Sequence, residues 1–155
     1  MKKLLALSLM IIICLSTLSS CEFIDKIKDM YNDFYEHGTE SLTLVQDFTV
    51  ELLSKDYDNA LTKIHPSSTI NKENLEKMRA DLLKNHNLDE LDSSSTISFT
   101  KLDFNISPIV SENGDIIQTQ YTVILTLEIA GIPVSISSIV LQDDLGFGIY
   151  TYVIR

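Results

Sequence analysis

The stretch IIQTQYTVILTLEIA, residues 116–130, decides the fold because it alternates apolar and polar side chains along its length. Alternation with a period of two is typical of a β-strand that has one face against a core and the other toward water. The apolar side is Ile117, Tyr121, Val123, Leu125, Leu127 and Ile129, and the polar side is Gln118, Gln120, Thr122, Thr126 and Glu128. These residues therefore predict a long strand of an antiparallel sheet.

Shorter alternating stretches accompany this strand, so residues 96–155 predict a sheet of four strands. The turn residues are Asn113-Gly114 before the long strand, Gly131-Ile132-Pro133 after it and Asp143-Asp144-Leu145-Gly146 near the end of the chain. Because each turn joins neighbouring strands, an antiparallel meander is the most economical topology. The alternation slips at Thr100-Lys101 and again between Ser138 and Ile139, and such slips predict bulges that curve the sheet.

Helical periodicity replaces this alternation in the first half of the chain. Four helices are predicted: residues 22–37 ending at Gly38, residues 41–55, a short helix capped by Asp56 or Asp58 and stopped by Pro66, and one capped by Asn71 that continues to about Asn85. The second has an apolar stripe formed by Leu42, Val45, Phe48 and Leu52, which we expect to meet the apolar side of the long strand. The order of elements predicts an α+β fold with helices on the concave face of a curved, four-stranded antiparallel sheet.

The first twenty residues have the pattern of a secretory signal peptide. A basic start, Lys2-Lys3, precedes an apolar run from Leu4 to Leu15 that is too short for a spanning helix of about 20 residues. The next residues, Leu18-Ser19-Ser20-Cys21, resemble the bacterial lipoprotein signal, in which the cysteine receives the lipid. A thiol is the side chain with the nucleophilicity to form that thioether. An ordinary signal peptide followed by a chance cysteine is the alternative.

The lipoprotein interpretation divides the chain into three parts. Residues 1–20 would be removed, residues 21–40 would carry the lipid on Cys21 and an amphipathic helix, and residues 41–155 would form the α+β domain. Fatty acyl chains such as palmitate would hold the protein on a membrane of the bacterial cell envelope, facing the periplasm or the cell exterior. The helix at residues 22–37 is expected to pack on its own domain, and the alternative is a helix that lies in the membrane interface.

The negative charge of the chain disfavours anionic partners. The sequence has 12 basic and 22 acidic residues, a net charge of −10, and loss of Lys2 and Lys3 with the signal peptide would make it −12. Nucleic acids and anionic lipid headgroups are poor partners for such a protein. Cys14 would leave with the signal peptide and Cys21 would be capped by lipid, so no disulfide is expected.

The stretch from Phe48 to Pro66, with Lys55-Asp56-Tyr57-Asp58-Asn59-Ala60-Leu61 leading into a short helix, resembles bacterial lipoproteins of the nuclear transport factor 2-like superfamily. The cystatin-like fold is a near neighbour. The resemblance extends from about Ser41 to Arg155, and it implies a cone-shaped α+β domain. The superfamily includes isomerases and dehydratases as well as members without catalytic activity.

The residues themselves predict no catalytic, cofactor-binding or metal-binding group. Tyr121 could donate a proton, but a buried, hydrogen-bonded tyrosine explains it more simply. Asp103 is expected on a solvated strand face. The histidines, His37, His65 and His86, are isolated near helix ends, where cap or surface roles suffice. The acidic groups Asp56 and Asp58, and Asp89, Glu90 and Asp92, lack the glycine and glutamate of a calcium-binding loop.

The leading functional hypothesis is a non-catalytic binding or accessory module for an envelope protein or a small apolar ligand. Its candidate pocket lining is Phe48, Tyr121, Val123 and Leu125, with a mouth at one end of the curved sheet. An isomerase or hydratase of the same fold is one alternative. An immunity- or exclusion-type surface lipoprotein is the other.

Overall fold

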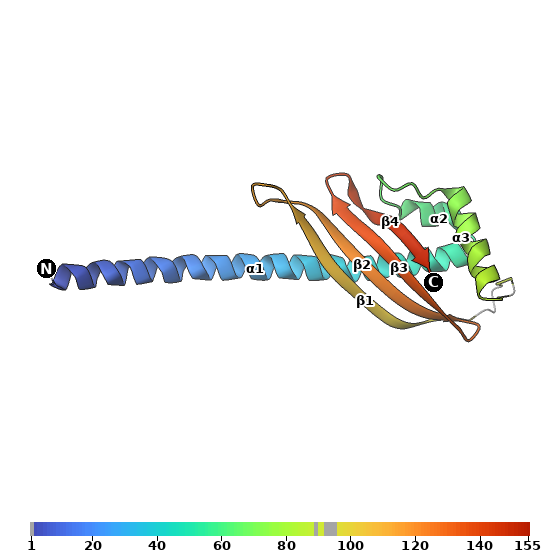
Figure 1. The fold of residues 1–155 in the computed structure, drawn as a ribbon, viewed down its shortest axis with the longest axis horizontal. Helices are drawn as coiled ribbons and strands as arrows, with labels where there is room; N and C mark the ends of the chain where they lie inside the picture. Colours follow the sequence, from blue (N-terminus) through green and yellow to red (C-terminus); the bar gives the residue numbers. More distant parts are fainter. Residues whose placement is uncertain (1, 89, 92–95) are drawn as a thin grey trace. The chain divides into compact units, whose positions relative to one another are not determined.

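The computed structural model describes the backbone of residues 2–88, 90–91 and 96–155, and the side chains of these ranges from residue 28 onward. Its elements are α1 (Lys2–Leu53), α2 (Tyr57–Thr62), α3 (Lys72–Asn85), β1 (Ile97–Val110), β2 (Ile116–Ile129), β3 (Ile132–Asp143) and β4 (Gly146–Ile154) (Figure 1). The strands form one antiparallel sheet in the order β1-β2-β3-β4. The α+β class and the meander are therefore confirmed.

The chain divides into two compact units, Met1–His37 and Gly38–Arg155. In the first unit the side chains of the predicted signal peptide and of Cys21 lie outside the described part of the chain. Its described side chains include Tyr31 and Tyr35, which are 65% and 58% exposed and stack with ring centroids 6.5 Å apart. Within the described part of the chain, no helix combines the length and apolar content that crossing a membrane requires. The packing of residues 22–37 on the domain stays a prediction.

The predicted helix end at Gly38 is wrong, because α1 continues through it to Leu53. The segments at residues 22–37 and 41–55 are thus one helix. Gly38 is buried, and a Cβ atom there would overlap the Phe104 ring, with Phe104 Cζ only 2.6 Å away. This glycine therefore allows close packing between α1 and β1. In the sequence alone, such a glycine looks the same as one that ends a helix.

The caps of the two shorter helices agree with the predictions. Asp56 caps α2 by accepting a hydrogen bond from the backbone N–H of Asn59. Asn71 caps α3 in a reciprocal capping box with Asn74, and α3 ends at Asn85 as predicted. Both caps satisfy backbone N–H groups that a helix start leaves without partners.

The sheet has a bulge at one of the two predicted positions, and the other bulge was predicted in the wrong strand. The β1–β2 register shifts between Phe99 and Lys101, which confirms the extra residue expected there. The slip predicted between Ser138 and Ile139 is wrong, because alternate burial in β3 continues through Val140. The extra residue lies opposite, in β4, where Tyr150 is skipped as the pairing changes from Thr151 to Ile149.

Two further details of the strands differ from expectation. Ile117 was placed on the core side, but it is 56% exposed because the β1–β2 register shifts beside it. The turn after β2 is centred on Ala130 and Gly131, whose φ values are 51° and 81°, while Ile132 and Pro133 already belong to β3. Positive φ at both central residues suits the right-handed twist of a two-residue hairpin.

The hydrophobic core lies between the helices and one face of the sheet. Val45, Phe48 and Leu52 from α1 are fully buried, as predicted, in one cluster with the apolar side of β2. The rings of Phe48 and Tyr152 meet edge to face, with centroids 4.7 Å apart. Full burial of each such side chain contributes about 1.5–3 kcal/mol, so this layer is the main source of stability.

Candidate functional site

A groove between α3 and the end of β4 is the candidate functional site, and its cavity volume is about 510 Å³. It is lined by Met78, Asp81, Leu82, Asn85 and His86 on one side and by Tyr152, Val153, Ile154 and Arg155 on the other. On α3 the spacing i, i+3, i+4 and i+7 from Met78 brings these side chains to one helix face. Small-molecule sites commonly have volumes of about 300–1,000 Å³, so the groove has a suitable size.

The deepest part of the groove is apolar. Leu82 and Tyr152 are 1% and 5% exposed and connect the groove to the core. The Tyr152 hydroxyl lies 2.9 Å from Thr49 Oγ1, so its polar group is occupied within the protein. Burial raises the pKa of Tyr152. Because its hydroxyl is bonded to Thr49, Tyr152 mainly offers its ring surface to the groove.

The rest of the groove is mixed in character. Asp81, Asn85 and Arg155 are exposed, and His86 and Met78 are half-buried. An apolar body could lie on the inner surface while a polar group contacts an amide, a carboxylate or a guanidinium at the outer part. This arrangement suits binding, because it offers few groups that could converge on one reacting atom.

Comparison with known proteins finds no family model, curated protein or solved structure that matches this chain. The geometry of the chain therefore carries the functional argument.

The predicted pocket residues lie elsewhere. Phe48, Tyr121, Val123 and Leu125 are all 0% exposed and belong to the hydrophobic core, and none of them lines the groove. As a pocket lining they stay a prediction. The Tyr121 hydroxyl donates a hydrogen bond to Gln142 Oε1 at 2.8 Å, which confirms the buried, hydrogen-bonded tyrosine that was expected. The groove was missed because no local pattern tells which strand end meets α3.

His65 differs most from its predicted cap or surface role, because its side chain has no exposed area. Its Nε2 lies 3.1 Å from Asp143 Oδ1, and its Nδ1 lies 2.7 Å from Ser67 Oγ. The neighbouring Ile64 forms a parallel bridge with Ile149 of β4. These contacts fix the segment after α2 to the β3–β4 hairpin.

The order Ser67, His65, Asp143 has the hydrogen-bond sequence of a hydrolase triad. A triad has the same tautomer, with one ring nitrogen accepting from the serine and the other donating toward the aspartate. Here, however, His65 Nδ1 also accepts from the backbone N–H of Ser67, at 3.2 Å, and the ring is fully buried. These contacts close a tight turn and hold Asp143, which favours a structural role for the histidine.

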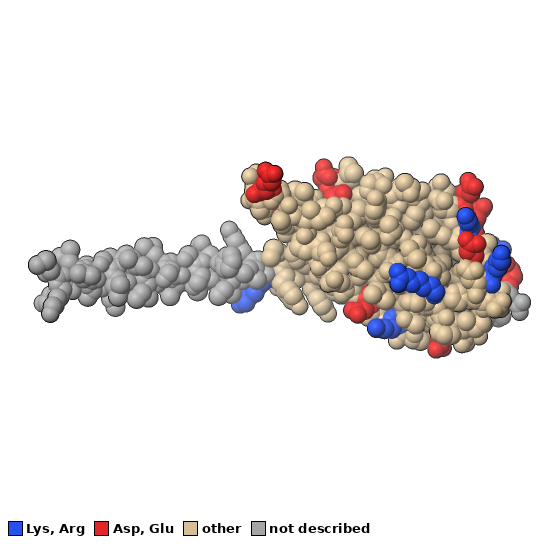
Figure 2. All heavy atoms as spheres, viewed as in Figure 1, with Lys and Arg blue, Asp and Glu red and all other residues tan. Residues whose placement is uncertain are grey.

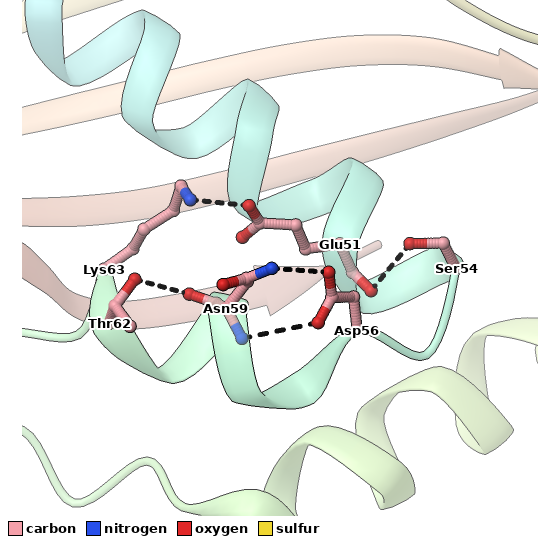
Figure 3. A network of polar contacts seen from close by, with 6 residues as sticks. All are labelled: Glu51, Ser54, Asp56, Asn59, Thr62 and Lys63. Carbon is pink, nitrogen blue, oxygen red and sulfur yellow. Dashed lines mark hydrogen bonds and ion pairs between the residues drawn. The ribbon is translucent and has the colours of Figure 1, made fainter.

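Two charged clusters connect the helices. The first comprises Glu51, Ser54, Asp56, Asn59, Thr62 and Lys63 at the junction of α1 and α2 (Figure 3). Its ion pair joins Glu51 Oε1 to Lys63 Nζ at 2.6 Å, and both side chains are about four-fifths buried. Removal of water strengthens such a pair, so it holds α2 against the end of α1.

The second cluster is built on Arg79, whose side chain is 6% exposed. Its Nε donates to the carbonyl of Leu53 at the end of α1, at 2.9 Å. Its Nη2 lies 2.9 Å from Glu90 Oε1, which also contacts Lys55 Nζ at 2.6 Å. Lys55, followed by Arg79, lowers the pKa of Glu90. The carboxylate of Glu90 is therefore engaged by two cations.

The remaining predicted positions are not brought together. Asp103 is exposed on β1. On α1, His37 Nε2 lies 3.6 Å from Asp33 Oδ1. Asp89 and Asp92 lie outside the described residues. Among the residues that the structure describes, no three His, Cys, Asp or Glu side chains are grouped so that they could hold a metal ion.

Proposed function

We propose that this chain is a lipid-anchored protein of the bacterial cell envelope whose acidic α+β domain is a non-catalytic binding module. Lipid on Cys21 would attach it to the membrane. The groove between α3 and β4 would bind a small apolar ligand or an apolar side chain of an envelope protein. The observation that supports this function is the groove itself, with its apolar inner surface and mixed outer part.

The finer fold assignment belongs to the same proposal. The order of helices and strands and the short α2 are compatible with a nuclear transport factor 2-like domain. That superfamily contains both enzymes and binding proteins, so the site has to decide between them. The hydroxyls of Tyr121 and Tyr152 are bonded to Gln142 and Thr49, which favours the binding hypothesis over an isomerase or hydratase.

A neutral apolar dye, N-phenyl-1-naphthylamine, can test the groove. We expect its fluorescence to rise with a lipid-free chain from Glu22 to Arg155. Asn85 lines the groove from α3 and is exposed, so Asn85→Trp should occupy the site and weaken dye binding by about tenfold or more. Val110→Trp is the matched control, because Val110 is 57% exposed in β1 and does not line the groove.

Circular dichroism should show that both variants are folded. Equal dye affinity of Asn85→Trp and the parent chain would show that the groove is not the binding site. In that case the immunity- or exclusion-type hypothesis, in which the protein acts through its outer surface, would be preferred.

A further inference from the structure

β1 is an edge strand with an unusual distribution of charge. Among the described residues it pairs only with β2, so the backbone groups on its other side have no strand partner. Lys101 and Asp103 are the only charged residues among its fourteen, and they flank Leu102, which is 45% exposed. An exposed edge with an apolar residue can pair with another chain.

The order Lys101-Leu102-Asp103 is complementary to itself when the strand is reversed. If two copies of β1 paired antiparallel about a two-fold axis at Leu102, each Lys101 would face Asp103 of the other copy. The two Leu102 side chains would then face each other. Opposite charges that face each other across an antiparallel pair stabilise it, and like charges destabilise it. This register therefore places two favourable charge pairs around one apolar contact.

The charge of the chain limits where two copies can approach each other. The chain has a net charge of −10, so two copies repel wherever their acidic groups approach. In Figure 2 the visible surface over the strands carries few charged side chains, while many of the acidic side chains in view lie near its edges. An isologous contact at β1 would place Lys101 of each copy against Asp103 of the other, so that opposite charges meet there. The two-fold axis generates both pairs.

We propose that β1 pairs antiparallel with β1 of a second copy, with the two-fold axis at Leu102. The contact is short. In this register Phe104 of one copy would face the extra residue Thr100 of the other, so the regular contact is limited to residues 101–103. The proposal does not depend on the groove or on the lipid.

Disulfide cross-linking of the full-length chain in expressing cells tests the register. Residues directly opposite in an antiparallel pair have Cα atoms about 4.5–5.5 Å apart, which a disulfide can bridge. We expect Leu102→Cys to form a cross-linked dimer on oxidation. Ser107→Cys is the control, because ten residue steps would separate the two copies of Ser107 by about 34 Å. We expect its cross-linking to be slower by about tenfold or more. The parent chain accounts for any dimer formed through Cys14 or Cys21.

Charge reversal in the Leu102→Cys background tests complementarity. Lys101→Asp or Asp103→Lys alone places like charges opposite each other twice, and we expect the cross-linking rate to fall about fivefold or more. The double exchange Lys101→Asp with Asp103→Lys should restore the rate. Co-expression of the two single variants with different tags should yield mixed dimers in preference to either homodimer. The proposal would be overturned if Leu102→Cys cross-linked no faster than Ser107→Cys, or if the charge reversals left the cross-linking rate unchanged.

Discussion

Asp143 has the clearest pH-dependent role among the described residues. The backbone N–H of Leu145 donates to its carboxylate at 2.8 Å and is the main cause of its lowered pKa, and His65 lowers it further. Because the folded state holds the ionised form more strongly than the unfolded chain does, ionised Asp143 stabilises the fold above its unfolded pKa of about 3.9. That contribution is lost as pH falls through the lower, folded pKa.

We therefore expect Asp143→Asn to lower the melting temperature most at neutral pH, with a difference from the parent chain that narrows below about pH 4. Thermal unfolding followed by circular dichroism between pH 7 and 3 measures this. Asp144→Asn, which removes the exposed carboxylate next along the chain, is the control and should change the melting temperature little. A constant offset for Asp143→Asn at all pH values would contradict a role for ionisation.

Single residues were predicted well where local chemistry decides their role. Asp56 and Asn71 cap helices because their side chains reach backbone N–H groups within three residues. His65 was not predicted, because its burial depends on Asp143, which is 78 residues away. Nothing in the spacing of an isolated histidine indicates such a partner, and the same is true of Arg79 and Leu53.

At the scale of elements, two backbone segments pack closely where the segment after α2 meets β4. A Cβ atom on Gly148 would come within 2.7 Å of His65 N and 2.9 Å of its Cα. The bridge holds both backbones in place, since His65 N–H donates to the Ile149 carbonyl at 3.0 Å and Ile149 N–H to that of Lys63 at 2.8 Å. We expect Gly148→Ala to lower the free energy of unfolding by about 1–3 kcal/mol, as measured by urea denaturation.

Thr151→Ala on the same strand is a suitable control, because Thr151 is half-buried and its substitution adds no atom to the backbone contact. Amide hydrogen exchange adds a local measurement: His65 and Ile149 should exchange faster in Gly148→Ala. Wild-type stability together with unchanged exchange would contradict the close contact.

Element boundaries followed from the sequence where a periodic pattern ended in a cap or a turn. The strand at residues 116–129 and the bulge at Thr100 were predicted because alternation is a local property. Gly38 was misread because a glycine selected for contact with Phe104 looks like one that ends a helix. The third-strand slip was misplaced because the extra residue, Tyr150, belongs to the neighbouring strand.

At the scale of the whole molecule, the meander could be predicted because each strand pairs with its neighbour in the chain. The groove could not, since it depends on how α3 and the end of β4 meet in space. The lipid anchor is a different kind of prediction. It rests on a short sequence pattern that, as a signal, would be read by processing enzymes before the domain folds, so the packing of residues 38–155 does not test it.

The last prediction concerns that anchor. Lipid transfer requires a thiolate, and a serine hydroxyl is too weak a nucleophile near neutral pH to replace it. We therefore expect Cys21→Ser to block lipid addition and, with it, the removal of residues 1–20, so that cells accumulate a precursor about twenty residues longer than the mature chain. Metabolic labelling with palmitate and gel mobility in membrane fractions measure both steps. Cys14→Ser is the matched control, because Cys14 lies within the apolar run and should be labelled and processed normally. Trimming of Cys21→Ser to the mature size with full membrane retention would show that the attachment does not depend on this thiol.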